Sequence, residues 1–281
     1  GFISGDFHEH PVSYFLKDMI YHFNDKFFES YGYYNHHLND KITKELKKEF
    51  SKFKYIHDLN DYEKLDLIRN DEIDILIDLS GHTSRNSLAI LKGKAAPIQM
   101  TWLGFSETTG IKEIDYIICD KISIPQNEER FFSEKPIRLK NSFYCFSNPG
   151  EDNFPIKRKP NKTLIYGCFS NIKKINETVI DSWTKILSKN TDSRILLKSQ
   201  YYRDEEIKES ILKKFLDEGI NETRITFDYD SLRENYLLDY NNIDVILDTY
   251  PYPGGTTTCE SLFMGTPVIT MEGNSFLSRN G

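Results

Sequence analysis

The sequence predicts an α/β protein of two domains, each built on a parallel sheet, and three observations support this prediction. Short apolar runs alternate with amphipathic helical stretches along the chain, which is the pattern of parallel strands joined by helices. The 281 residues, 38% of them hydrophobic, are enough to form two packed cores. A polar stretch with almost nothing to bury, residues 146–163, separates two runs of this alternation. The predicted domains are 1–150 and 151–281, and both are Rossmann-like.

In the first half, the predicted elements follow one another with few breaks. After the strand Phe2-Ile3, a helix is predicted from Pro11 to about Asn24, because proline in a first turn costs no hydrogen bond and the following apolar residues share one face. The clearest buried strand runs from Ile73 to Leu79. The other predicted elements are strands near Phe27–Tyr34, Tyr55–His57, Ile98–Leu103 and Tyr116–Cys119, and helices at 41–52 and near 61–70.

A second alternation begins after residue 163. In order, it predicts the strand Leu164–Phe169, helix 176–190, strand Arg194–Lys198, helix 204–218, strand Ile225–Phe227, helix 231–241, strand Val245–Leu247, helix 256–264 and strand Val268–Thr270. Two Rossmann-like halves are expected to bind a ligand in the cleft between them, at the carboxyl ends of the strands.

Charge and cysteine content limit the functional classes. The formal net charge is −7 and neither half is basic, so the sequence lacks the cationic surface with which proteins bind nucleic acid. No run approaches the ~20 consecutive apolar residues of a membrane-spanning helix. The four cysteines have no CxxC spacing, which favours free thiols in a reducing cytoplasm over disulfides or a zinc site. Both ends interrupt the pattern, so we expect a fragment of a longer chain.

A turn rich in proline and glycine, residues 250–255, leads into the last predicted helix. This helix begins on Thr256, Thr257 and Thr258, and a helix N-terminus offers unpaired N–H groups and the positive end of a dipole. The arrangement suits a diphosphate, with threonine hydroxyls as further donors. Glu260, one turn on, is placed to accept hydrogen bonds from ribose hydroxyls. The competing interpretation is an ordinary helix with Thr256 as its N-cap and Glu260 favouring the dipole.

A second polar turn follows the strand Leu164–Phe169 and carries Asn171, Lys173 and Lys174. A lysine at this place can stabilise, as a point charge, the negative charge that develops on a leaving diphosphate. The competing interpretation is a solvated lysine pair on a loop.

All seven histidines lie within the first 82 residues, so any histidine chemistry belongs to the first half. His10 and His82 follow strand ends, and either can take a proton near neutral pH. We expect His22 and His57 to be partly buried, and His36 and His37 to lie in a solvated loop. His8 and His10 suggest a metal pair, but no third ligand has suitable spacing, so the sequence predicts no metal site. Trp102, before a loop bounded by glycine, is expected in the core.

Six segments, taken together, resemble the catalytic region of the protein O-GlcNAc transferase family, which includes the Spindly-type protein O-fucosyltransferases. They span nearly the whole chain in the family's order, and six dispersed matches are more specific than any one of them. The segments are Gly5-Asp6-Phe7-His8-Glu9-His10-Pro11, Asp74–Thr83, Ala96–Gly104, Asp115–Asp120, Phe169–Ile175 and Asp248–Pro267.

The resemblance implies a GT-B glycosyltransferase with an acceptor-side N-terminal domain and a nucleotide-sugar-binding C-terminal domain. The family transfers a single sugar to Ser or Thr hydroxyls, with inversion and without a metal ion or other cofactor. His10 matches the family's active-site histidine, which is proposed as general base, and Lys174 matches its diphosphate-binding lysine. Thr256 and Thr257 match the threonines that bind the donor phosphate.

Three positions bear on the identity of the donor. Asn171 stands where O-GlcNAc transferases usually carry Gln, and Glu260 replaces their ribose-binding Asp, as it does in the Spindly type. Gly255 stands where the animal enzymes have a histidine in a His-Thr-Thr run. The family as a whole implies UDP-GlcNAc as the donor, and these three departures keep GDP-fucose as the close rival.

The implied partners are a nucleotide-sugar donor and a protein or peptide acceptor. In the family a tetratricopeptide superhelix recruits the acceptor, and this sequence lacks that region. Two other interpretations remain open. One is a nucleotide-sugar 2-epimerase, which also uses two Rossmann halves but needs no protein acceptor. The other is a non-catalytic remnant that still binds a nucleotide.

Overall fold

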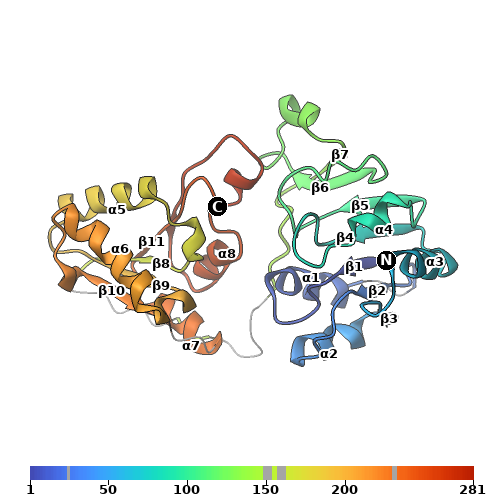
Figure 1. Cartoon of the computed structure of the whole chain (residues 1–281), viewed down its shortest axis with the longest axis horizontal. Helices are drawn as coiled ribbons and strands as arrows, with labels where there is room; N and C mark the ends of the chain where they lie inside the picture. Colours follow the sequence, from blue (N-terminus) through green and yellow to red (C-terminus); the bar gives the residue numbers. More distant parts are fainter. Residues whose placement is uncertain (24–25, 148–153, 157–162, 230–232) are drawn as a thin grey trace. The chain divides into compact units, whose positions relative to one another are not determined.

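The computed structural model describes residues 1–23, 26–147, 154–156, 163–229 and 233–281. The chain divides into unit 1 (Gly1–Asn148) and unit 2 (Pro149–Gly281), and each has its own sheet (Figure 1). The prediction of two Rossmann-like α/β units is confirmed. The domain boundary that we predicted at residue 150 lies in 148–153, outside the described residues.

Seven parallel strands form the sheet of unit 1, in the order β3-β2-β1-β4-β5-β6-β7. The order runs outward from β1 in one direction and from β4 in the other, so the topology switches between these two strands. In such sheets a ligand binds beyond the carboxyl ends of the strands at the switch point. The strands are β1 (Phe2–Ser4), β2 (Tyr31–Tyr34), β3 (Lys52–Tyr55), β4 (Ile75–Asp78), β5 (Ile98–Thr101), β6 (Tyr116–Asp120) and β7 (Lys135–Leu139).

Helices cover both faces of this sheet because successive strand residues point to opposite faces. The helices are α1 (Pro11–Tyr21), α2 (Lys41–Glu49), α3 (Asp61–Asn70) and α4 (Leu88–Lys92), with the 3-10 helix η1 (Gln126–Phe131). On one face, Ile3 of β1 packs in a core that contains Ile68 of α3 and Leu91 of α4. On the other face, the ring of Phe2 packs on Phe50, the C-cap of α2, with 5.9 Å between ring centroids.

The sheet of unit 2 repeats this plan with five parallel strands in the order β10-β9-β8-β11-β12. Its topology switches between β8 and β11, which are hydrogen-bonded neighbours. The strands are β8 (Ile165–Cys168), β9 (Arg194–Lys198), β10 (Ile225–Asp228), β11 (Val245–Leu247) and β12 (Val268–Ile269).

Two cores enclose this second sheet. Trp183 of α5 and Phe215 of α6 belong to the first core, and Leu237 of α7 and Met264, the C-cap of α8, belong to the second. The helices are α5 (Glu177–Lys189), α6 (Glu205–Asp217), α7 (Arg233–Leu238) and α8 (Thr256–Phe263), and the 3-10 helices are η2 (Ile172–Lys174), η3 (Gln200–Arg203), η4 (Glu222–Arg224), η5 (Asp239–Asn242) and η6 (Leu277–Arg279).

A buried ion cluster joins three elements of unit 2. Lys198, the last residue of β9, is only 2% exposed. Its Nζ lies 2.6 Å from Asp228 Oδ2 at the end of β10 and 2.5 Å from Asp239 Oδ2 in η5. Because a buried ammonium is costly unless it is paired, these contacts fix the carboxyl ends of β9 and β10 against η5.

Several predicted elements differ from the structure. The strand predicted at Tyr55–His57 lies instead at Lys52–Tyr55. It is an edge strand, and its two lysines interrupt the apolar run that would have marked it as a strand. The strand β7 and the helix α4 were missed, because β7 is a polar edge strand and α4 has only five residues. The helix predicted at 231–241 is divided into α7 and η5, and residues 231–232 lie outside the described residues. Trp102 is buried, as predicted.

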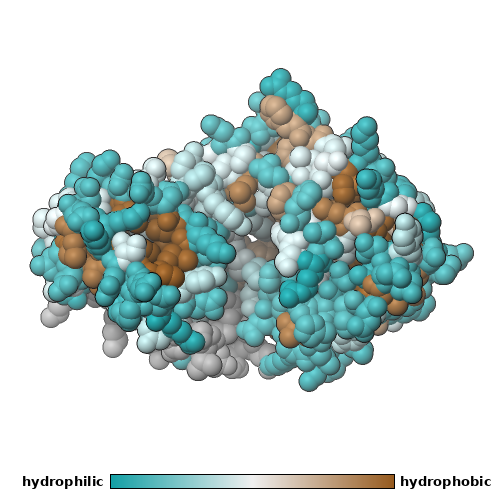
Figure 2. Space-filling view, viewed as in Figure 1, coloured by the Kyte–Doolittle hydropathy of each residue, from teal (hydrophilic) through white to brown (hydrophobic). Residues whose placement is uncertain are grey.

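The surface seen in Figure 2 is mostly hydrophilic, with smaller hydrophobic areas on both units. Of the large apolar side chains that the structure describes, Tyr62 and Phe27 are the most exposed, at 82% and 78%. Within the described ranges, every helix is too short or too polar to cross a membrane.

Candidate functional site

The predicted site residues follow the strands that flank the two switch points. In unit 1, the segment that ends at His10 follows β1, and the segment that contains His82 follows β4. The two strand ends are joined, since Leu79 N donates to the carbonyl of Ile3 over 3.1 Å. Unit 1 therefore brings both histidine segments to the carboxyl edge of its sheet, where its topology predicts a ligand.

His10 is the N-cap of α1 and precedes Pro11 in the first turn, as predicted. Its Nδ1 accepts a hydrogen bond from the backbone N–H of Val12 over 3.3 Å, which satisfies one of the free donors of the helix start. Burial lowers the pKa of His10 to about 4, so the ring is neutral at pH 7. Since Nδ1 is an acceptor, the neutral ring carries its proton on Nε2. Asp6 Oδ2 lies 3.8 Å from Nδ1.

His82 has the same tautomer as His10, but the other ring nitrogen makes its hydrogen bond. Its Nε2 lies 2.8 Å from the carbonyl oxygen of Thr109, and because a carbonyl only accepts, Nε2 carries the proton. The neutral ring therefore has an unprotonated Nδ1. Asp78, at the end of β4, shapes this turn by accepting from Gly81 N over 2.8 Å and from Ser80 N over 3.2 Å. Burial raises the pKa of Asp78 to about 6.

The remaining histidines correct two expectations. His36 was expected in a solvated loop but is 3% exposed, and burial with the nearby Arg85 lowers its pKa to about 4. His36 packs against His8 and His37, with ring centroids 5.3 and 4.5 Å apart. We did not predict this cluster from the sequence, although its histidines follow the neighbouring strands β1 and β2. His22, also expected to be partly buried, is exposed, because it is the C-cap of α1 at the surface. His57 is half-buried beyond β3, as expected. Among the described residues, no three His, Cys, Asp or Glu side chains form a possible metal site.

In unit 2, Lys174 ends the short η2 helix that follows β8. Its Nζ donates to the carbonyl of Pro253 over 2.8 Å, and this links the β8 turn to the turn after β11. The ring of Tyr252 lies against the same ammonium, with 3.8 Å from Nζ to the ring centroid. Burial lowers the pKa of Lys174 to about 8. Asn171 caps η2, since its Oδ1 accepts from Lys173 N over 3.0 Å.

The start of α8 differs from the simple capped helix that we considered. Its N-cap is Gly255, not Thr256, and no side chain of the described residues caps it. A Cβ atom on Gly254 would lie 2.5 Å from Thr257 Oγ1 and 2.7 Å from Thr258 Oγ1, so only glycine fits beside these hydroxyls. The helix therefore presents threonine hydroxyls and an uncapped N-terminus next to the turn that holds Lys174.

Glu260, the predicted ribose partner, lies in the second turn of α8 and is 2% exposed. Its carboxylate thus lies inside unit 2 rather than at the surface beside the threonines. The structure brings together Asn171, Lys174 and the threonine turn in unit 2, and His10 and His82 in unit 1. Tyr252 and Pro253 are site residues that we did not predict, although the Tyr-Pro-Tyr-Pro run before the glycines was a visible signal.

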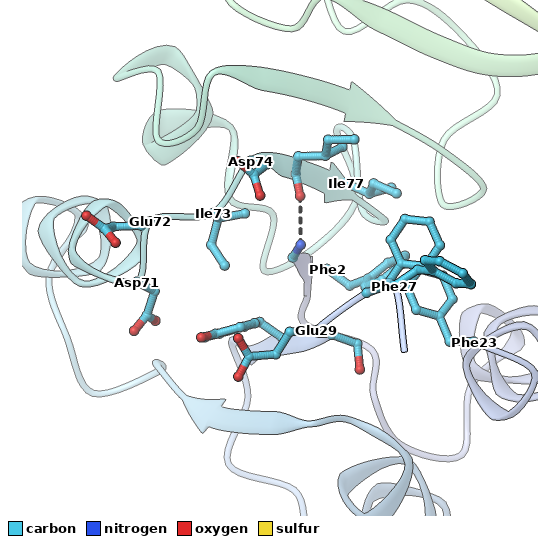
Figure 3. Close-up of a pocket in the computed structure, with 14 residues that line it drawn as sticks. Phe2, Phe23, Phe27, Glu29, Asp71, Glu72, Ile73, Asp74 and Ile77 are labelled. Atoms are coloured by element: carbon cyan, nitrogen blue, oxygen red, sulfur yellow. Dashed lines mark hydrogen bonds between the residues drawn. The ribbon is translucent and has the colours of Figure 1, made fainter. Parts of the chain in front are cut away.

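A pocket of about 380 Å³ lies elsewhere, at the amino ends of β1, β2 and β4. Figure 3 shows the rings of Phe2, Phe23 and Phe27 on one side of it and the carboxylates of Glu29, Asp71 and Glu72 on the other. Asp71 is already paired, with Lys54 Nζ 2.6 Å from its Oδ1. Because this pocket faces the edge of the sheet opposite to His10 and His82, we do not assign it to the same site.

Comparison with known proteins gives consistent results. The sequence pattern of glycosyl transferase family 41 matches residues 1–148 and 156–281. A rice protein (Oryza sativa subsp. japonica), described as a probable UDP-N-acetylglucosamine–peptide N-acetylglucosaminyltransferase SPINDLY, is 33% identical over 98% of this chain and 30% of its own length. The Arabidopsis thaliana protein of the same description named SEC is 25% identical over 96% of this chain and 29% of its own length.

Among solved structures, a mutant O-GlcNAc transferase from Thermobaculum terrenum superimposes with a TM-score of 0.94 and 32% identity. The match covers 100% of this chain and 54% of that protein. The chain thus spans less than a third of the two plant relatives and about half of the bacterial structure.

Proposed function

Because the chain belongs to glycosyl transferase family 41, we propose that it forms the catalytic region of an inverting glycosyltransferase. The proposed reaction moves GlcNAc from UDP-GlcNAc to Ser or Thr hydroxyls of proteins. The activities for which the two plant relatives are named support this choice of donor and of a peptide acceptor. The observation that carries the proposal is the placement of Lys174 beside the uncapped start of α8, at the switch point of unit 2.

This placement suits a leaving diphosphate. In the reaction, a bond forms between the acceptor oxygen and C1 of the sugar while the bond from C1 to the phosphate oxygen breaks. Negative charge develops on the diphosphate, and the ammonium of Lys174 and the dipole of α8 stabilise it. We propose that Asn171, Thr256, Thr257 and Thr258 contribute further polar contacts to the donor. Glu260 is left out of this set, because its side chain is only 2% exposed. These residues need no metal ion or cofactor for that task.

The acceptor hydroxyl must also lose its proton, and the two histidines of unit 1 are the proposed bases. His82 has an unprotonated Nδ1, because its Nε2–H donates to Thr109. In His10 the unprotonated Nδ1 is occupied by Val12 N–H, so this hydrogen bond must break before the ring accepts a proton there. The hydrogen bonds thus favour His82 as base and His10 as a neutral Nε2–H donor, whereas the resemblance favours His10.

A second donor, GDP-fucose, has a specific observation in its favour. The N-cap of α8 is Gly255, so this position lacks the histidine side chain that the animal O-GlcNAc transferases carry before their threonines. A glycine leaves more room beside the start of α8 than a histidine would, and this suits a different nucleotide sugar. We therefore retain protein O-fucosyl transfer as the second candidate.

We further propose that the acceptor protein is recruited by a tetratricopeptide region outside this chain. The proposed compartment is the cytoplasm, because Cys119, Cys145, Cys168 and Cys259 are all free, as thiols are in a reducing environment.

Thermal unfolding with UDP-GlcNAc, GDP-fucose, UDP or GDP tests the proposal, because a ligand that binds only the native state raises its stability. We expect the uridine pair to raise the unfolding temperature more than the guanosine pair. The reverse order selects GDP-fucose, and no shift with any of the four rejects a nucleotide-sugar enzyme. Product analysis then separates the alternatives, since free epimerised sugar nucleotide indicates an epimerase and binding without turnover indicates a non-catalytic remnant.

A further inference from the structure

The loop Thr249–Gly254, between β11 and α8, is held by hydrogen bonds at both ends. Asp248 Oδ1 accepts from the backbone N–H groups of Thr249, over 2.8 Å, and of Gly254, over 2.7 Å. Within the loop, Thr249 Oγ1 donates to the carbonyl of Tyr252 over 2.7 Å. The backbone of Tyr252 is therefore fixed without any ligand.

Two groups of this loop hold the ammonium of Lys174. Nζ donates to the carbonyl of Pro253 over 2.8 Å and lies 3.8 Å from the centroid of the Tyr252 ring. At that distance the negative face of the ring attracts a cation. Burial takes water away from Lys174 and lowers its pKa to about 8, while the carboxylate of Asp248 acts in the opposite direction. The ring thus replaces part of the hydration that the ammonium has lost.

An aromatic ring has an advantage over a carboxylate at this position. A paired carboxylate would neutralise the ammonium and compete with a diphosphate for it. The nearby Asp248 is engaged elsewhere, since Oδ1 accepts two backbone N–H groups and Oδ2 accepts from Thr270 Oγ1 over 2.8 Å. The ring of Tyr252 stabilises the positive charge without cancelling it, so the charge stays available to an anion.

Building on the function proposed above, we propose that Tyr252 is a positioning residue, whose ring keeps Lys174 charged and oriented for the diphosphate of the donor. Tyr252 acts through Lys174 and is assigned no contact with the reacting atoms. Its hydroxyl has no part in this role, because the attraction comes from the ring face. The other titratable groups that face Lys174 are Asp248 after β11 and the thiol of Cys168 in β8.

The test compares two variants. Tyr252→Phe keeps the aromatic ring, whereas Tyr252→Leu removes the ring but leaves an apolar side chain over Lys174. Tyr229→Leu is the matched control, because Tyr229 is also 47% exposed and its ring lies 5.7 Å from another cation, Arg203. The first measurement is the pKa of Lys174 without nucleotide, from the pH dependence of its acetylation followed by mass spectrometry. We expect Tyr252→Leu to lower this pKa by about 0.4 to 1.5 units and the other two variants to leave it unchanged.

The second measurement is the affinity for UDP and GDP between pH 6.5 and 9.5, by calorimetry. Binding that needs the ammonium weakens as the pH rises through the pKa of Lys174. In Tyr252→Leu this loss starts at lower pH, so the ratio of its Kd to that of the parent protein grows to roughly 3- to 30-fold at pH 9.5. Taking the ratio at each pH cancels the titration of the nucleotide itself.

The two measurements distinguish a failure of the role proposed for Tyr252 from a failure of the proposed function. A pKa of Lys174 that is equal or higher in Tyr252→Leu overturns the role of Tyr252, even if nucleotides bind normally. A lowered pKa in a protein that binds neither UDP nor GDP rejects the proposed function but leaves Tyr252 as the residue that holds the charge.

Discussion

The Nε2–H group of His82 donates to the backbone carbonyl of Thr109 over 2.8 Å. This bond fixes the orientation of the imidazole and leaves its Nδ1 unprotonated in the neutral ring. In His10 the same atom, Nδ1, accepts the Val12 N–H at the start of α1. The backbone groups around the two histidines therefore leave different ring nitrogens available, Nδ1 in His82 and Nε2–H in His10.

The first prediction separates the roles of the two histidines. In the complete enzyme, His82→Ala and His10→Ala should both reduce turnover strongly at saturating donor while leaving nucleotide affinity nearly unchanged, which marks interactions with the acceptor or transition state. The loss of turnover should be larger in His82→Ala than in His10→Ala, because His82 is the proposed base. Single-turnover assays measure this, with His22→Ala at the end of α1 as the control. If His82→Ala turns over at the normal rate and His10→Ala is inactive, the general base is His10.

The second prediction concerns the donor. Lys174→Ala should weaken UDP or GDP binding roughly 10- to 100-fold, because it removes a charge-assisted contact of about 1.5–3 kcal/mol. Lys173→Ala is the matched control, since Lys173 is the exposed neighbour in η2. Calorimetry on both variants decides. Equal affinities of the folded variants would remove Lys174 from the donor site.

The third prediction is that chelation has no effect. A lysine and a helix dipole are proposed to balance the charge of the diphosphate, so EDTA should leave donor binding and transfer intact. Transfer assays with and without EDTA measure this. Activity that is lost on chelation and restored by Mn²⁺ or Mg²⁺ would contradict the proposed mechanism.

The fourth prediction follows from the buried His36. The unfolded chain protonates this ring below its ordinary pKa of 6.5, but the native protein does so only below about 4. The free energy of unfolding should therefore fall as the pH is lowered from 6.5 to 4, by at most about 1.4 kcal/mol per pH unit from this group. His36→Asn keeps an acceptor for Leu38 N–H and removes the titration, so its urea-unfolding profile should be flatter. An unchanged slope contradicts the assignment.

The fifth prediction concerns the ion cluster of unit 2. Lys198→Met should lower the free energy of unfolding by about 2–4 kcal/mol, because it leaves the carboxylates of Asp228 and Asp239 without their shared cation. The estimate lies below the value for fully buried pairs, since both carboxylates are partly exposed. Denaturant unfolding compares this variant with Lys213→Met on the exposed face of α6. Equal stabilities would show that the cluster contributes nothing.

Elements with a complete local signal were predictable. The bounds of β9 and β11 agree with the prediction to the residue, because each is an apolar run between polar turns. The helix α3 also begins and ends as predicted, and its start carries a capping box formed by Asn60 and Glu63. The edge strand β7 has no such signal, since its only strongly apolar residues are Ile137 and Leu139.

The candidate site was predictable only in part, because some of its contacts join distant segments. The strand–turn–helix pattern located Lys174 and the threonines at strand ends. It gave no indication that His36 is covered by the segment after β1, or that the ring of Tyr252 lies on Lys174. The caps also depend on backbone angles, so Gly255 rather than Thr256 became the N-cap of α8.

The position of the two switch points has a consequence for how such an enzyme can change. The residues assigned to donor and acceptor lie in turns after β1, β4, β8 and β11, whereas the apolar cores lie between the sheets and their helices. A change within such a turn, for example at Gly255, can therefore alter the preferred sugar nucleotide at little cost to folding, provided that Tyr252 and Pro253 keep their contacts with Lys174. Gene duplication followed by turn replacement would then create new specificities on an unchanged scaffold, and grafting turns between relatives offers a direct engineering route.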